Sequence, residues 1–97
     1  MLTNDMSNLF PKIGTNVNFN LQNAPRKVTS IPRKMYTIRN YTPGATVFVG
    51  YTPEVDISSG FPILGGEVIY LNTAADLYIL SDQIGEDFCD VRIMVLS

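Results

Sequence analysis

Four short apolar runs lie between residues 45 and 81, and proline and glycine separate them at even intervals. Residues 47–51 and 55–57 show the apolar–polar alternation of a strand with one buried face. Residues 68–71 and 77–80 are near-continuous apolar runs, as in core strands of a sandwich. The loops between these runs leave no room for a helix of ordinary length. The stretch therefore predicts an antiparallel β module.

Turn sequences mark the ends of these runs. Thr42-Pro43-Gly44-Ala45 places proline second and glycine third, an arrangement that suits a type II turn. Ser58-Ser59-Gly60 and Gly65-Gly66 predict backbone positions with positive φ, which residues with a Cβ resist.

Further strands are predicted on both sides of this module. Residues 16–21, within a probable strand at 15–21, alternate three apolar residues with three asparagines. Asparagine is depleted in strands, so this pattern suits an edge strand or one that faces a polar partner. Residues 34–41 predict a strand with Tyr36 and Ile38 inward. Residues 91–96 predict a strand that is central or covered, because both of its faces carry apolar residues.

Residues 23–34 contain two near-repeats, Pro25-Arg26-Lys27 and Pro32-Arg33-Lys34. Proline cannot donate to a sheet ladder, and positive charge protects a strand edge from unwanted pairing. Residues 28–31, between the repeats, therefore predict a short edge strand.

These patterns predict an all-β fold, a single antiparallel β-sandwich or jelly-roll-like domain of about 7–8 short strands. We expect residues 34–97 to form the sandwich core and residues 1–33 to form an N-terminal arm and edge segment. The residues expected between the two sheets are Val47, Val49, Val55, Ile57, Val68, Tyr70, Leu77, Ile79, Val91, Ile93 and Val95.

The composition fits one small domain with surface reserved for contacts. The 97 residues are 45% hydrophobic, which excludes an intrinsically disordered chain. Only 16% are charged, below the roughly 25% of an average domain, so part of the surface is expected to be covered by a partner. The single cysteine, Cys89, cannot form an internal disulfide and is expected to be a small buried hydrophobe.

The charge is divided between the two halves of the chain. Residues 1–40 hold six basic residues and one acidic residue, net +5, whereas residues 41–97 hold one basic and eight acidic residues, net −7. Such asymmetry indicates an interaction segment. We expect residues 1–33 to engage a neighbouring subunit, with head-to-tail or strand-addition contacts. The candidate partner-binding residues are Arg26, Lys27, Arg33, Lys34, Phe10, Asp82, Glu86 and Asp87.

The sequence lacks the residues or the spacing that nucleophilic catalysis, calcium binding and phosphate binding require. With no histidine, serine and cysteine nucleophiles have no histidine base, so no enzyme activity and no catalytic residues are expected. The acidic residues 82–90 do not match the spacing of a calcium loop, and Gly65-Gly66 does not match a phosphate cradle. The sequence therefore predicts neither a metal nor a cofactor.

Nucleic acid and membrane are not expected as partners. The basic residues 25–34 lack aromatics for stacking, and the rest of the chain is acidic. No apolar run approaches the ~20 residues needed to span a bilayer, and the N-terminus does not have the pattern of a secretory signal. Glycan binding stays open as an alternative, because Tyr41 and Tyr51 flank turns and could supply an aromatic platform.

The middle of the chain contains the runs Val47-Phe48-Val49-Gly50, then Gly60-Phe61-Pro62-Ile63-Leu64 with Gly65-Gly66-Glu67, and Asp76-Leu77-Tyr78-Ile79-Leu80-Ser81. With these runs it resembles small β-sandwich proteins in the virions of tailed bacteriophages. In that family a valine–tyrosine–valine–glycine strand is followed by a glycine-rich turn and a leucine–tyrosine–alanine strand. The resemblance covers residues 36–95.

The resemblance implies a non-enzymatic structural component of the virion, assembled in the host cytoplasm. A capsid decoration or cement protein is the first expectation. A head-fibre, neck or tail protein and a glycan-binding adhesion module are the alternatives. The implied partners are the major capsid protein or neighbouring copies, with a homo-oligomer in the assembly. Met1 and the final strand near Ser97 lead us to expect a complete gene product.

Overall fold

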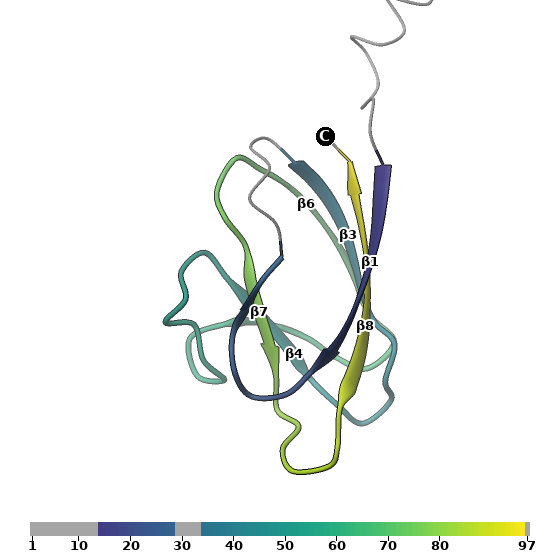
Figure 1. The fold of residues 1–97 in the computed structure, drawn as a ribbon, viewed down its shortest axis with the longest axis vertical. Helices are drawn as coiled ribbons and strands as arrows, with labels where there is room; N and C mark the ends of the chain where they lie inside the picture. The colour runs from purple at the N-terminus through teal and green to yellow at the C-terminus, as the bar shows by residue number, and fades with distance from the viewer. Residues whose placement is uncertain (1–13, 29–33, 97) are drawn as a thin grey trace, which may run out of the picture.

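Two four-stranded antiparallel sheets face each other in this protein (Figure 1). The computed structural model describes residues 14–28 and 34–96. Sheet A has the strand order β1-β8-β3-β6, and sheet B has the order β2-β7-β4-β5. The strands are β1 (Gly14–Leu21), β2 (Arg26–Lys27), β3 (Lys34–Asn40), β4 (Val47–Gly50), β5 (Phe61–Ile63), β6 (Val68–Thr73), β7 (Tyr78–Ser81) and β8 (Cys89–Leu96).

The strand pairing is nested along the chain. The first strand pairs with the last, β2 pairs with β7, β3 with β6 and β4 with β5. The chain is thus one long antiparallel ribbon, and the additional pairings of β3 with β8 and β4 with β7 roll it up into two sheets. An eight-stranded double sheet of this kind is a jelly roll. The predicted all-β sandwich or jelly-roll-like fold is confirmed. Within the described ranges no helix is long and apolar enough to cross a membrane.

The core lies between the sheets and follows the predicted alternation in most strands. In β3 the buried pair is Tyr36 and Ile38, as predicted. The last strand, β8, is central in sheet A, and it buries Val91, Ile93 and Val95 while Arg92 and Met94 face solvent. The strand at residues 16–21, whose asparagines suited an edge, is β1 and lies at an edge of sheet A. Cys89 is buried as predicted, and burial raises the pKa of its thiol.

Three residues expected in the core are exposed: Ile57, Val68 and Tyr70. In β6 the apolar run occupies both faces of the strand, so its period could not decide which face is inward. The structure pairs Ile69 with the buried Ile38, so Ile69 and Leu71 pack against the core instead. Tyr51, predicted on the inward face of its strand, is also exposed, because β4 ends at Gly50.

Residues 55–57 are not the predicted strand but part of a connection with turns at residues 53–54 and 57–59. The Asp56 carboxylate accepts hydrogen bonds from the backbone N–H groups of Ser58 (3.0 Å) and Ser59 (2.8 Å). Such side-chain bonds stabilise a turn at the expense of a ladder. They also lower the pKa of Asp56, the Ser58 hydroxyl contributing most. Val55 is nevertheless buried, as expected.

Two short strands differ from the prediction. At the edge of sheet B, β2 is Arg26–Lys27 rather than residues 28–31; Val28 follows it and is buried, and residues 29–31 lie outside the described residues. Phe61–Ile63, not predicted, forms β5. It contains Pro62, and proline is tolerated at a sheet edge, which is where β5 lies. Of the predicted N-terminal arm and edge segment, residues 1–33, residues 14–28 contain β1 and β2, whereas residues 1–13 and 29–33 lie outside the described residues.

The turn glycines act in two ways. Gly44 (φ +80°) and Gly66 (φ +86°) adopt positive φ, and the Ala45 N–H donates to Thr42 C=O as predicted for the first turn. Gly60 and Gly65 do not have positive φ, contrary to prediction. A Cβ at Gly60 would lie 2.7 Å from the Cβ of Phe48, so this glycine is required for close packing.

Two buried polar side chains join the sheets. Asn40, at the end of β3, donates through Nδ2 to the carbonyl oxygens of Ala45 (2.8 Å) and Ile63 (2.9 Å), the latter in sheet B. Its Oδ1 accepts from Thr42 N–H (3.1 Å) and Cys89 Sγ (3.2 Å). Ser81 in β7 donates through Oγ to the Leu21 carbonyl (2.8 Å) in β1. Neither residue was predicted to have this role.

Replacing Asn40 by alanine should lower the free energy of unfolding by about 2–4 kcal/mol, because it leaves two carbonyls and an N–H buried without a partner. Urea denaturation measures the loss. Asn20→Ala, at an exposed position of β1, is the matched control and should change stability by less than about 0.5 kcal/mol. Equal effects of the two substitutions would contradict this assignment.

The Tyr36 side chain is buried, and its hydroxyl finds no hydrogen-bond partner in the described structure. Burial, helped by the charge of Asp76, raises its pKa to about 12. The folded state holds the Tyr36 hydroxyl proton more tightly than the unfolded state does. The contribution of this pKa difference to the free energy of unfolding is therefore fully present below pH 10. The free energy of unfolding should fall by up to about 2–3 kcal/mol as pH rises from 10 to 12. Tyr36→Phe should remove this part of the pH dependence in denaturation curves, with a change at pH 7 within about 1 kcal/mol. The raised pKa of Tyr36 would be contradicted if the free energies of unfolding of the wild type and of Tyr36→Phe had the same pH dependence.

Candidate functional site

The solvent-facing side of sheet A, which we call the outer face, gathers polar and apolar side chains from all four strands. Alternation along each strand places the core residues on one side and this set on the other. A groove of about 520 Å³ crosses the outer face. The side chains that line it include Asn18, Thr37, Arg39, Val68, Tyr70, Arg92 and Met94.

Two arginines stand opposite each other on this face. The register of β3 and β8 pairs Arg39 with Arg92. Like charges directly opposite in a sheet are destabilising. The ring of Tyr41 lies beneath both guanidinium groups, at 5.3 Å from Arg39 and 4.2 Å from Arg92, and these cation–π contacts offset part of the repulsion. The outer face therefore presents two adjacent positive charges on a tyrosine ring.

Only one of these two arginines has a carboxylate partner. Asp90 Oδ2 lies 3.1 Å from Arg92 Nη2, and this hydrogen bond and charge raise the pKa of Arg92. In residues 14–28 and 34–96, no carboxylate forms an ion pair with Arg39. The Arg39 charge is therefore available to an anionic group of a partner.

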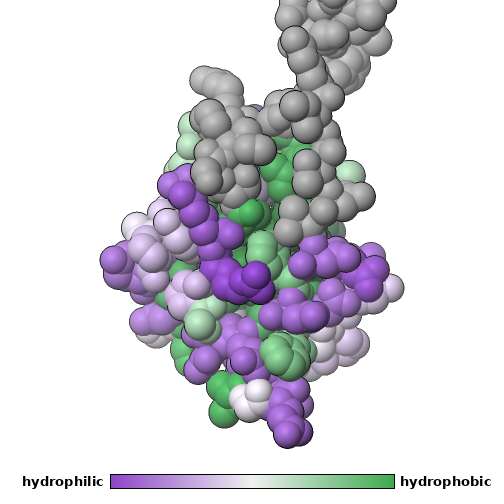
Figure 2. Space-filling view, in the orientation of Figure 1, coloured by the Kyte–Doolittle hydropathy of each residue, from purple (hydrophilic) through white to green (hydrophobic). Residues whose placement is uncertain are grey.

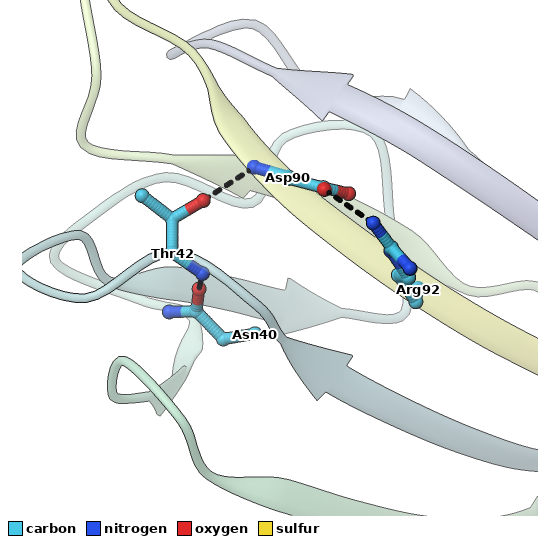
Figure 3. Close-up of polar contacts among 4 residues, drawn as sticks. All are labelled: Asn40, Thr42, Asp90 and Arg92. Atoms are coloured by element: carbon cyan, nitrogen blue, oxygen red, sulfur yellow. Dashed lines mark hydrogen bonds and ion pairs between the residues drawn. The ribbon is translucent and has the colours of Figure 1, made fainter.

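A chain of hydrogen bonds connects this ion pair to the core (Figure 3). Asn40 Oδ1 accepts from the Thr42 N–H, and Thr42 Oγ1 accepts from the Asp90 N–H at 2.7 Å. Asp90 in turn binds Arg92. The buried amide thus helps to orient an exposed guanidinium through Thr42 and Asp90.

The basic residues selected from the sequence lie elsewhere. Arg26 and Lys27 form β2, at the edge of sheet B. The Arg26 guanidinium lies 4.7 Å from the Phe19 ring centroid, and Lys27 Nζ lies 3.4 Å from Asp76 Oδ2. Lys34 begins β3 opposite Thr73. Phe10 and Arg33 lie outside the described residues.

The acidic residues selected from the sequence lie in the connection between β7 and β8. Asp82 Oδ1 accepts from the Thr46 N–H (3.1 Å) and from Gln83 Nε2 (2.8 Å), so this side chain holds the loop. Glu86 and Asp87 are exposed. Gln22 Nε2 donates to the carbonyls of Gly85 (2.6 Å) and Asp87 (3.0 Å), which ties the loop to the segment before β2. No ion pair joins this loop to Arg26 or Lys27 in the described structure.

A second concave feature lies between the sheets beside β6. This apolar cleft has a volume of about 460 Å³, and its lining includes Val49, Tyr51, Phe61, Ile69, Leu71 and Leu77. The space-filling view shows green hydrophobic residues between purple hydrophilic residues on the two sides of the molecule (Figure 2). The part of the chain that the structure describes holds no group of three or more cysteine, aspartate or glutamate side chains placed to bind a metal ion.

Comparison with known protein families finds no family that matches this sequence, and comparison with curated proteins finds no matching relative. The function is therefore argued from the fold and from the outer face of sheet A.

Sequence reasoning missed Arg39, Arg92 and their shared contact with Tyr41. Arg39 and Arg92 are 53 positions apart, and only the pairing of β3 with β8 brings them together. The one local signal was the strand alternation, which put Arg39 and Arg92 opposite the buried residues of their strands. That signal shows exposure but not proximity.

Tyr41→Leu should lower the free energy of unfolding by about 1–2 kcal/mol at low salt, because both cation–π contacts are lost and the two guanidinium groups repel without compensation. At high salt the loss should shrink, since exposed charges are screened. Tyr41→Phe keeps a ring at the same place and serves as the control. Denaturation curves at two salt concentrations measure the effect, and equal losses for both variants at low salt would argue against the cation–π contacts.

Proposed function

We propose that this protein is a non-enzymatic structural protein of a virion, in the capsid decoration or cement class, and that the outer face of sheet A contacts a neighbouring virion protein. The observation that carries the proposal is the Arg39–Arg92 pair, exposed on Tyr41 in the middle of a sheet. Two solvent-exposed like charges destabilise the isolated chain because they repel each other. An acidic segment of a partner would attract both arginines and compensate for this repulsion.

The surroundings of the arginine pair suit a protein partner. Exposed apolar side chains, Val68, Tyr70 and Met94, line the same groove. Interfaces typically combine aromatic, methionine and arginine side chains, and these residue types meet here. The partner surface would carry carboxylates beside apolar groups.

The fold gives weaker support, by analogy. Eight-stranded jelly rolls occur in viral capsid domains and in lectins, and the resemblance of residues 36–95 to phage virion proteins points to the first of these. Fold alone does not assign function, so the proposal depends on the outer face.

Glycan binding is a second candidate, favoured by one observation. Tyr70 is 73% exposed in a groove that also holds Asn18 and Thr37, an aromatic ring beside polar side chains. Of the two tyrosines considered from the sequence, Tyr41 carries two guanidinium groups, and Tyr51 lines the apolar cleft. A glycan array probed with the isolated protein separates the candidates, because a lectin binds sugar without an assembly.

The test measures copies of the protein in gradient-purified virions by quantitative mass spectrometry. The wild-type chain should be present in stoichiometric amounts, and Arg39→Glu should reduce its occupancy by at least about tenfold. This substitution places a carboxylate opposite Arg92, so it should not destabilise the fold.

Arg26→Glu is the matched charge reversal outside the outer face and should leave occupancy within about twofold of wild type. If Arg26→Glu lowered the occupancy and Arg39→Glu did not, the contact would lie at the β2 edge, which contradicts the proposed surface. Absence of the wild-type protein from intact virions would contradict the function itself.

A further inference from the structure

The edge strands of the two sheets differ in protection. Exposed edges invite pairing with other chains, and charges or prolines usually prevent it. In sheet B, β2 consists of Arg26 and Lys27, and β5 contains Pro62. At the edges of sheet A, neither β1 (GTNVNFNL) nor β6 (VIYLNT) contains a charge or a proline. Both strands offer their backbone without either of these protections.

The two open sides of the sandwich distinguish β6 from β1. On the side of β1 and β2, the Arg26 guanidinium covers the Phe19 ring. On the side of β6 and β5, the apolar cleft is open, with Phe61 and Tyr51 exposed along it. Of the two unprotected edges of sheet A, β6 is therefore the one that adjoins an uncovered apolar surface.

The register shows which backbone groups of β6 are free. The Asn40 N–H donates to the Glu67 carbonyl, so these two residues form a hydrogen-bonded pair. The next pair along the ladder, Arg39 and Val68, is then a non-hydrogen-bonded pair. Because bonded and non-bonded pairs alternate in an antiparallel ladder, Ile69 and Leu71 direct their backbone groups toward β3. Val68, Tyr70 and Asn72 direct theirs toward the free edge.

We propose that β6 pairs antiparallel with β6 of a second copy of this chain, joining two copies of sheet A across a two-fold axis. In the symmetric register Tyr70 lies opposite Tyr70 of the second copy, and Val68 lies opposite its Asn72. All three residues have free backbone groups, so each pair exchanges both hydrogen bonds. The pairing is isologous and closes as a dimer.

The side chains of β6 suit a second copy. β6 carries no charged residue, so the pairing sets no like charges opposite each other at the axis or beside it. Tyr70, 73% exposed in the single chain, would stack on its symmetry mate on the outer face. On the inner face the two apolar clefts would meet, where Phe61 and Tyr51 of both copies have apolar surface to cover. The dimer goes beyond the proposed function and does not depend on it.

Sedimentation of the purified full-length protein over a range of concentrations tests the pairing. The wild type should show a monomer–dimer equilibrium. Tyr70→Lys, which sets two positive charges on the axis, should weaken dimerisation at least about tenfold. Ile57→Lys, an exposed apolar residue replaced outside the cleft, should leave it within about twofold. Circular dichroism verifies that both variants fold.

The register has its own test. Tyr70→Cys should form an intermolecular disulfide on mild oxidation, because the two cysteines face each other on the axis, whereas the buried Cys89 should not react. A wild-type chain that stays monomeric at every concentration overturns the proposal. So does a dimer that Tyr70→Lys leaves intact, or one that Tyr70→Cys does not cross-link. These outcomes are read in solution, so they are distinct from loss of the protein from virions.

Discussion

The buried amide of Asn40 is the contact on which the arrangement of the two sheets depends most directly. It ends β3 in sheet A, bonds the carbonyl of Ile63 in sheet B, and holds the turn that leads into β4 through Ala45 and Thr42. A buried amide must have partners for its donors and acceptor, and here the partners come from both sheets. The hydrogen-bonding requirement of one side chain therefore sets how the chain passes between the two sheets.

The same amide contributes to the surface. Through Thr42 and Asp90 it helps to hold Arg92 against Tyr41, and the register of β3 and β8 adds Arg39. The tyrosine ring offsets part of the repulsion between the two arginines in the single chain. A preorganised pair of positive charges loses little entropy on binding, which favours recognition of an anionic group.

Most of the fold could be predicted from local pattern. Alternation in residues 16–21 and 34–41 identified β1 and β3 with their inward faces, because polar residues dominate the other side of each strand. Residues 91–96 were assigned as a strand with Val91, Ile93 and Val95 inward, and β8 has this arrangement. The pattern failed in β6, where both faces are apolar, and at residues 55–57, where Asp56 forms a turn. Little of the candidate site was predicted: the charged segments selected for their local density lie at β2 and in the β7–β8 connection, away from the arginine pair.

The sequence by itself determined the class of fold, since short alternating runs separated by proline and glycine permit only strands and tight turns. It also determined that the chain has no histidine and a single cysteine. The tertiary structure alone decided which strands are neighbours, and therefore that Arg39 meets Arg92, that Asn40 bridges the sheets, and that β6 is left as an unprotected edge. The physical reason is that alternation is a local property of the backbone, whereas pairing between β3 and β8 joins residues about fifty positions apart and depends on how the whole ribbon rolls up.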